Sequence, residues 1–234
     1  MLLRGGEQRS AIALVLDVFG DEARHFVFVG GCVMGLYARP QGSPIRTTKD
    51  VDCVSTLVPW VLQQKTLAKL CEQGILRPDP EIQCRYRIKG TDVDVDVLSP
   101  EGLNVGGPNP WLQLGSQKAK PYVLEDGRSI NALTPPYFLA TKLVAFEDRG
   151  TDPQSSKDLE DIVAVAVEVP DLVEQVTAEV IAREIAALWE GAFQKHSLRL
   201  SDVPELVDWH LHRDDKDDRG RVITTLRKLA SGAV

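Results

Sequence analysis

The alternation of hydrophobic and polar positions divides this chain into a first part that mixes strands with helices and a second part built of helices. Apolar residues recur at helical spacing from Glu7 to Phe19, and Gly20 follows as a stop signal. The next segment, HFVFVG at 25–30, has the β-branched and aromatic character of a short strand and ends on a glycine pair. Together with CVMGLYA at 32–38, this order predicts a helix, a strand, a tight turn and one small helix.

The middle of the chain alternates between strand and helix patterns. The segment KDVDCVS at 49–55 predicts a strand, and the amphipathic stretch at 59–74, which begins with proline and ends with glycine, predicts a helix. The stretch IQCRYRIKGTDVDVDVLS at 82–99 has period-two alternation on both sides of Gly90, as a hairpin does. The residues PEGLNVGGPNPW at 100–111 are rich in Gly, Pro and Asn and predict an irregular connection.

Beyond one more strand pair around 120–133, the pattern contains only helices. Prolines open one predicted helix at 135–150, and a serine cap followed by acidic residues opens the next at 155–168. Further helical patterns run through 171–195 and 202–230. The mixture of strands and helices that comes before these helices predicts an α/β or α+β sheet domain.

The change of pattern near Thr134 predicts two domains. A chain of 234 residues with 43% hydrophobic content can bury a full core as one large domain or as two small ones. We therefore expect a core domain at 1–134 and a helical domain at 135–234 that completes the functional site.

Composition narrows the class of protein. A net charge of −7 and a pI near 5.2 exclude a protein that coats nucleic acid nonspecifically, since that binding needs many unopposed cations. The four cysteines form no CxxC pair, which is typical of reduced thiols in a cytosolic protein. The N-terminal residues contain no apolar leader pattern, and no apolar run reaches the roughly 20 residues that span a bilayer. We expect a cytoplasmic protein without membrane partners.

Two aspartates lie one residue apart in the predicted strand at 49–55. Asp50 and Asp52 would project from the same face, about 6 to 7 Å apart, because side chains alternate along a strand. Such carboxylates repel each other unless cations compensate, and a pair of Mg²⁺ ions would do so. The same pattern is expected for an edge strand with two solvent-exposed aspartates and no ligand. The DxD motif alone favours that simpler interpretation.

The glycine pair Gly30 and Gly31 shifts the balance towards function. Glycines at the end of a strand let the backbone turn sharply and approach a ligand, and the next helix presents free N–H groups to a phosphate. An ordinary strand-to-helix turn also contains glycines. The order of apolar strand, glycine pair, short helix, loop and DxD strand is more specific than either motif alone.

A third carboxylate is available in TDVDVDVLS at 91–99. Asp92, Asp94 and Asp96 share one face by period two, and the intervening valines share the other. An exposed acidic face without ligands is the competing interpretation, but three stacked carboxylates are costly without a nearby cation. We select Asp96 as the third metal ligand and keep Asp94 as the alternative.

Basic residues alternate on the strand that precedes this acidic one. Arg85, Arg87 and Lys89 fall on one face of CRYRIK. They could contact a polynucleotide or a triphosphate, or they could pair with the acidic neighbouring strand. The second use is favoured.

The order of these blocks resembles a known family. GG, RTTKDVD, VDVL, ATKLVAF with the following RG, and SKDLEDI occur as they do in nucleotidyltransferases of the DNA polymerase β-like superfamily, and they are most similar to the AbiEii/AbiGii-type toxin nucleotidyltransferases. The likeness covers Val27 to about Val167. It implies a polymerase β-like mixed sheet with flanking helices, followed by a C-terminal helical bundle.

The resemblance implies roles for residues of the first part. Gly30 and Gly31 would hold the triphosphate of an NTP substrate. Asp50 and Asp52 would bind Mg²⁺, with two ions implied for the site. Asp96 would be the third carboxylate, which orients or deprotonates the attacking hydroxyl.

The resemblance also assigns residues on either side of that core. Arg46 and Thr48 match the R-x-T-x-D pattern, and Arg46 would pair with a phosphate. Lys142 would neutralise triphosphate charge, and Asp158 would position that lysine or a nucleotide group. Lys142 and Arg149 fall on one helix face, so two cations can line one wall, although surface ion pairs explain the same spacing.

The function implied is an Mg²⁺-dependent nucleotidyltransferase, a phosphotransferase that moves NMP from an NTP to an acceptor hydroxyl. The acceptor would be a tRNA 3′ end, which would make the protein a toxin with an antitoxin partner. A small-molecule (aminoglycoside-like) or protein nucleotidyltransferase is the alternative within this fold, and a noncatalytic nucleotide-binding or interaction module is the second. A tRNA acceptor requires a local basic surface, for which the candidates are Arg85, Lys118, Lys120, Lys142 and Arg149.

Overall fold

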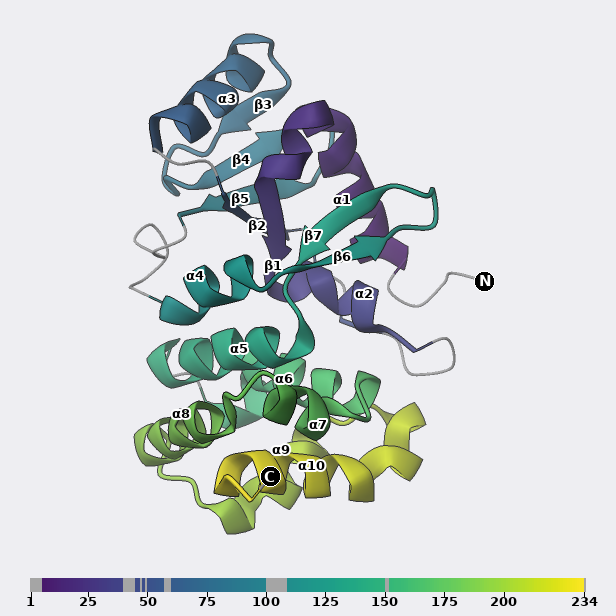
Figure 1. Cartoon of the computed structure of the whole chain (residues 1–234), viewed down its shortest axis with the longest axis vertical. Coiled ribbons are helices and arrows are strands. Elements are labelled where there is room, and N and C mark those ends of the chain that lie inside the picture. Colours follow the sequence, from purple (N-terminus) through teal and green to yellow (C-terminus); the bar gives the residue numbers. More distant parts are fainter. Residues whose placement is uncertain are drawn as a thin grey trace. The chain divides into compact units, whose positions relative to one another are not determined.

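The computed structural model forms two compact units, shown with their elements in Figure 1. The sheet unit contains Met1–Leu36 and Arg46–Thr134, and the helical unit contains Tyr37–Ile45 and Pro135–Val234. The chain therefore enters the helical unit once, at Tyr37, returns at Arg46, and enters it again after Thr134. The structure describes residues 6–39, 45–46, 48, 50–56, 60–99, 109–149 and 152–233.

A seven-stranded mixed sheet is the centre of the sheet unit, with strand order β3-β4-β5-β2-β1-β7-β6. Two neighbouring pairs, β1 with β7 and β2 with β5, are parallel, and the other pairs are antiparallel. The hairpin predicted around Gly90 is confirmed as β4 and β5. The strands are β1 (Phe26–Val29), β2 (Asp50–Ser55), β3 (Leu76–Pro78), β4 (Arg85–Ile88), β5 (Asp94–Leu98), β6 (Lys120–Val123) and β7 (Ser129–Ala132).

The helices of the first 134 residues confirm most of the pattern-based predictions. The strand, tight turn and small helix expected after the first helix are present, and the turn is a 3-10 segment, Gly30–Val33. The strands β1 and β5 are buried along their whole length, so the sheet is the core of this unit. The helices are α1 (Gly6–Phe19), α2 (Met34–Tyr37), α3 (Trp60–Glu72) and α4 (Pro110–Gln117), with a further 3-10 segment at Gly20–His25.

Two elements differ from the sequence-based prediction. Part of the stretch expected to be irregular forms α4, because Asn109 accepts a hydrogen bond from the backbone N–H of Trp111 at 3.1 Å and Pro110 opens the helix. The rest of that stretch, 100–108, lies outside the described residues. The short strand β3 was not predicted, since its three residues end in a proline. Asp92 lies before β5, so only two aspartates, Asp94 and Asp96, are stacked on that strand.

The helical unit has a buried core in which Trp189 is the largest side chain. Its second long helix begins at the predicted serine cap, where Ser156 accepts from the N–H of Leu159 at 3.3 Å. Among the residues that the structure describes, no helix combines the length and apolar character that crossing a bilayer requires. The helices are α5 (Pro135–Arg149), α6 (Lys157–Glu168), α7 (Leu172–Ala178), α8 (Ala182–Lys195), α9 (Val203–His210) and α10 (Arg219–Ser231), joined by 3-10 segments at Pro153–Ser155, Leu200–Asp202 and Arg213–Asp218.

Polar and aromatic contacts fix the early segment of the chain within the helical unit. The backbone N–H of Arg39 donates to Glu168 Oε2 at 2.6 Å, and its guanidinium donates to Asp218 Oδ2 at 2.7 Å. The ring of Tyr37 packs edge-on against Phe138, with centroids 5.7 Å apart. These residues are far apart in sequence, and no periodicity of the chain predicts their contact.

Candidate active site

Four carboxylates lie on one face of two neighbouring strands in the sheet unit. The parallel register of β2 and β5 pairs Asp50 with Asp94 and Asp52 with Asp96. Val51, between the two aspartates of β2, is fully buried. The predicted alternation is therefore confirmed: the valines face the core and the aspartates share the opposite face.

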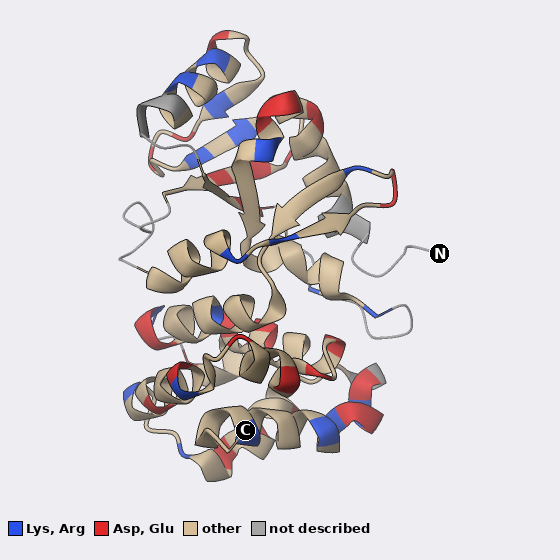
Figure 2. Cartoon of the chain, in the orientation of Figure 1, with Lys and Arg blue, Asp and Glu red and all other residues tan. Residues whose placement is uncertain are grey.

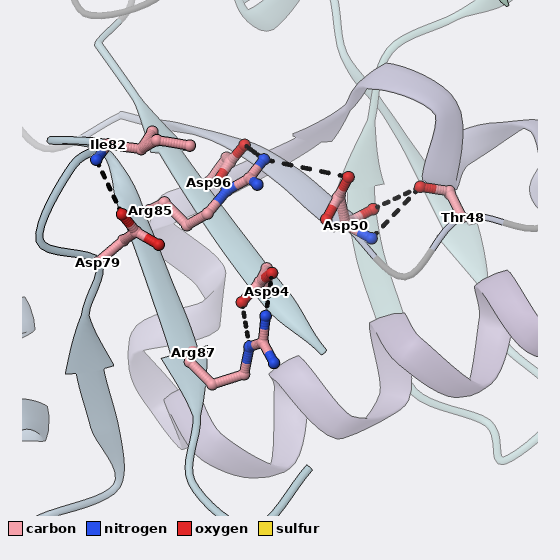
Figure 3. A network of polar contacts seen from close by, with 8 residues as sticks. All are labelled: Thr48, Asp50, Asp79, Ile82, Arg85, Arg87, Asp94 and Asp96. Atoms are coloured by element: carbon pink, nitrogen blue, oxygen red, sulfur yellow. Dashed lines mark hydrogen bonds and ion pairs between the residues drawn. The ribbon is translucent and has the colours of Figure 1, made fainter. Parts of the chain in front are cut away.

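Two arginines of β4 neutralise the aspartates of β5. The Nε and Nη2 of Arg85 donate to the two carboxylate oxygens of Asp96 at 2.8 and 2.7 Å, and Arg87 makes the same bidentate contact with Asp94 (Figure 3). The hydrogen bond with Asp96 raises the pKa of Arg85 above its ordinary value. The favoured prediction for these arginines, pairing with the acidic neighbouring strand, is confirmed.

Arg85 also connects the two acidic strands. Its Nη2 lies 4.0 Å from Asp50 Oδ2, so one guanidinium contacts carboxylates on both β2 and β5. The side chain of Asp50 is 48% exposed and that of Asp96 is 10% exposed. Of the two carboxylates that Arg85 contacts, Asp50 is thus exposed to solvent and Asp96 is nearly buried.

Gly30 makes room for the carboxylate of Asp52. Its φ of +66° lies in the left-handed region, which is unfavourable for residues that have a Cβ. A Cβ at this position would lie 2.0 Å from Asp52 Oδ2, far inside van der Waals contact. Gly30, rather than Gly31, has the left-handed φ, so the two members of the predicted glycine pair have different roles.

We expect the Gly30→Ala variant to unfold more easily than a matched glycine variant. Gly20→Ala provides the control, because Gly20 also has a left-handed φ, +53°, but a Cβ there meets nothing within 4 Å. Both variants lose about 1 kcal/mol from the disfavoured φ, and Gly30→Ala loses a further 1–3 kcal/mol, roughly, from the clash with Asp52. Urea denaturation of the two proteins measures the difference, and equal losses would show that Asp52 can move aside without cost.

The two residues of the R-x-T-x-D pattern are placed next to β2. The N–H of Asp50 donates to Thr48 Oγ1 at 3.3 Å, so this hydroxyl fixes the start of the strand (Figure 3). Arg46 is half-buried. Thr47 and Lys49 lie outside the described residues.

A second polar cluster lies in the helical unit, between α5 and α6. Lys142 Nζ is 3.3 Å from Asp158 Oδ1 and 2.6 Å from Asp161 Oδ2. Arg149 Nη1 donates to Asp158 Oδ2 at 2.8 Å, so both predicted cations meet on Asp158. The side chains of Asp158 and Asp161 are 3% and 4% exposed, which rules out the alternative that Lys142 forms a surface pair.

Asp161 was not predicted to contact the lysine. The signal was present in the sequence, because Asp158 and Asp161 are separated by one helical turn, which puts both carboxylates on one face of α6. That spacing does not show which helix packs against this face of α6. Asp158 is in hydrogen-bond contact with Lys142, and its role in positioning that lysine for a ligand stays a prediction.

The oxygen donors of the sheet unit suit a hard divalent cation only in part. Carboxylates are the ligands that Mg²⁺ takes, and Asp50 and Asp52 both lie on the open face. Asp96 is held on both oxygens by Arg85 and would have to exchange this partner to bind a metal. Among the described residues, no set of three or more His, Cys, Asp and Glu side chains has the arrangement of a metal site.

Three of the five cations expected to form a basic surface for a tRNA acceptor already have carboxylate partners. Arg85, Lys142 and Arg149 each form an ion pair with an aspartate. Lys120 lies on β6, the edge strand at the other end of the sheet from the β3-β4 end where Arg85 lies. The basic surface stays a prediction, and spacing along the chain does not show which of its cations are already compensated.

Comparison with known proteins finds a matching family model and a solved structure of similar fold. The family model described as "Nucleotidyl transferase AbiEii toxin, Type IV TA system" matches residues 14–220, which extends the likeness beyond the Val27 to Val167 region recognised from motifs. A solved structure of an antigenic nucleotidyltransferase-like protein from Paracoccidioides brasiliensis is similar in fold, with a TM-score of 0.52 and 14% identity over 80% of this chain and 93% of that chain. No curated protein sequence matches the chain.

Proposed function

The chain belongs to the AbiEii family of nucleotidyltransferase toxins of type IV toxin–antitoxin systems, and on that premise we propose that it moves NMP from an NTP to the hydroxyl of an acceptor. The observation that supports this most directly is the acidic face itself. Asp52 lies against Gly30, and Asp50 and Asp96 lie beside it on the same face of the sheet. We propose that these carboxylates surround the reacting phosphate, as the resemblance implies.

The reaction forms one bond to the α-phosphorus and breaks another. The acceptor oxygen attacks the α-phosphorus, the bond from that phosphorus to the oxygen bridging the α- and β-phosphates breaks, and pyrophosphate leaves with the electron pair. The proton of the attacking hydroxyl passes to a carboxylate of the acidic face, for which we propose Asp96. Positioning and charge neutralisation lower the barrier, without a covalent enzyme intermediate.

A divalent cation would be held by Asp50 and Asp52. When bound, Mg²⁺ would supply positive charge against the oxygens of the triphosphate. Gly30 and the backbone N–H groups of the turn at Gly30–Val33 would bind phosphate oxygens, and Arg46 would pair with a phosphate. We propose that Lys142, positioned by Asp158, adds a further positive charge to the triphosphate.

We also propose a cytoplasmic location and an antitoxin partner. The four cysteines are free thiols, as a reducing compartment keeps them, and burial raises the pKa of Cys53 well above its usual value. The type IV description of the family supports the antitoxin.

Metal removal and restoration test the enzymatic proposal. The protein is incubated with each α-labelled NTP, Mg²⁺ and total tRNA, and the products are separated into RNA, protein and small molecules. Label is expected on RNA with at least one NTP, to be lost with EDTA, and to return when Mg²⁺ is added in excess. Label on protein or on a small molecule would move the acceptor to the alternative class, and no label anywhere would contradict the transferase.

A further inference from the structure

A basic cavity lies on the outer strands of the sheet unit, and its lining includes Arg87 and Lys89, two of the three cations predicted on one face of CRYRIK. Its volume is about 460 Å³, which falls within the range of small-molecule and cofactor sites. Among the described residues that line it, three are cationic and none is acidic. The lining residues are Gly74, Leu76, Arg77, Arg87, Lys89, Gly90 and Thr91, and we call the cavity the outer-strand pocket.

The register of the sheet gathers these cations on one face. Arg77 of β3 is directly opposite Arg87 of β4, and Lys89 follows Arg87 by two residues. Like charges directly opposite each other on neighbouring strands are unfavourable unless something compensates them. Arg87 is compensated by Asp94, whereas Arg77 and Lys89 are exposed and form no ion pair with a described residue. An anion in the pocket would compensate both.

Two turns that contain glycine, at Gly74 and Gly90, line the pocket beside the cations. Gly74 and Gly90 both have a left-handed φ, +67° and +79°. A Cβ at Gly74 would lie 3.6 Å from Lys89 Nζ, so the ammonium group lies over this turn. The hydroxyl of Thr91 donates to the carbonyl of Ile88 at 3.0 Å and accepts from the N–H of Val93 at 3.2 Å, so it is already engaged within the turn.

The pocket shares its face with the acidic site. Successive pairings place Arg77, Arg87, Asp94 and Asp50 in one row across β3, β4, β5 and β2. Figure 2 shows the same change from basic residues on β3 and β4 to acidic residues on β5 and β2. Strands about 4.8 Å apart put the two ends of this row about 14 Å from each other, a distance that a few nucleotides of single strand can span.

We propose that the outer-strand pocket binds a backbone phosphate of a nucleic-acid acceptor and leads the acceptor strand along the row towards Asp50. This proposal rests on the proposed nucleotidyl transfer, and it names the acceptor class as nucleic acid. Arg77 and Lys89 supply the charge, and Arg87 fixes the position of the pocket relative to the acidic strands through Asp94. Of the three cations, Arg77 was not singled out in the sequence, whereas Arg87 and Lys89 fall on the basic face of CRYRIK.

A pair of double variants tests the pocket directly. Arg77→Gln with Lys89→Gln removes two charges from it, and Lys65→Gln with Lys69→Gln removes two exposed charges from α3 of the same unit. Binding of fluorescently labelled total tRNA is measured by anisotropy at several KCl concentrations. The pocket variant is expected to bind at least about tenfold more weakly at 50 mM salt, with the slope of log K against log salt reduced by about 1 to 2, whereas the α3 variant changes by less than about threefold.

Three other results would each contradict the proposal in a distinct way. Equal losses in both double variants would show a general charge effect. A lower melting temperature with unchanged tRNA binding would show that Lys89 only stabilises the end of α3. Weaker binding of NTP, measured separately without RNA, with tRNA binding unchanged would assign the pocket to the triphosphate. Because binding is measured without turnover, a wild-type protein that binds tRNA through the pocket but transfers no label would contradict the proposed function alone.

Discussion

Replacing Asp96 by asparagine is expected to lower nucleotidyl transfer by roughly a thousandfold, while the same change at Asp94 lowers it by less than about tenfold. Both aspartates lie on β5, both are nearly buried, and each binds one arginine of β4 on both oxygens. The register separates them, because Asp96 lies beside Asp52 and Asp94 lies beside Asp50. Arg85, the partner of Asp96, also reaches Asp50, so Asp96 belongs to the group that includes both residues of the DxD motif.

The comparison of these two variants separates chemistry from stability. Each variant removes one Asp–Arg ion pair, so similar decreases in melting temperature are expected from both. The rate of label transfer at saturating NTP, measured on folded protein, then reports the loss of the carboxylate itself. A larger loss in Asp94→Asn would make Asp94 the third carboxylate, and equal losses would mean that neither has the role proposed for Asp96.

The Lys142→Met variant is expected to lose about 3–5 kcal/mol of stability. Lys142 lies between Asp158 and Asp161, whose side chains are almost completely buried. Methionine keeps most of the volume of the lysine stem but removes the ammonium group that lies 2.6 Å from Asp161. A buried carboxylate that loses a neighbouring cation cannot recover hydration, and this cost is far larger than that of losing a surface pair.

Arg149→Met is the matched control for the lysine variant. Arg149 binds the same Asp158, but its side chain is 61% exposed, and Asp158 keeps Lys142 when Arg149 is removed. A loss below about 1 kcal/mol is therefore expected. Urea unfolding followed by tryptophan fluorescence and by circular dichroism measures both variants. If Lys142→Met costs no more than Arg149→Met, the buried aspartates do not depend on the lysine.

The sequence predicted the secondary structure well where hydrophobic residues recur with a clear helical or strand period. The alternation in KDVDCVS and in DVDVDVL gave β2, β5 and the face on which their aspartates lie. The helix α4 was missed because glycine, proline and asparagine dominate the preceding residues, and the cap at Asn109 is a signal only one residue long. The parallel pairing of β2 with β5 joins strands separated by a helix and two other strands, and residue periodicity has no information about such pairings.

The sequence motifs identified the candidate site residues but did not predict which of these residues contact each other. Gly30 was recognised as a turn residue, but its closeness to Asp52 depends on the antiparallel pairing of β1 with β2. The pairing of arginines with the acidic strand followed from period two, whereas the choice of Arg85 for Asp96 depends on register. The cations that matter for a polyanion are those left over after such pairings, and only the folded structure shows which ones they are.

The position of Arg39 has a consequence for the order in which the protein is made. Its partners Glu168 and Asp218 follow it by 129 and 179 residues, and a ribosome delivers the chain from the N-terminus. The two contacts of Arg39 can therefore form only after synthesis has passed Glu168 and Asp218, long after β2 with its two aspartates has been made. A nascent chain that stops before Asp218 cannot have the finished structure around Arg39.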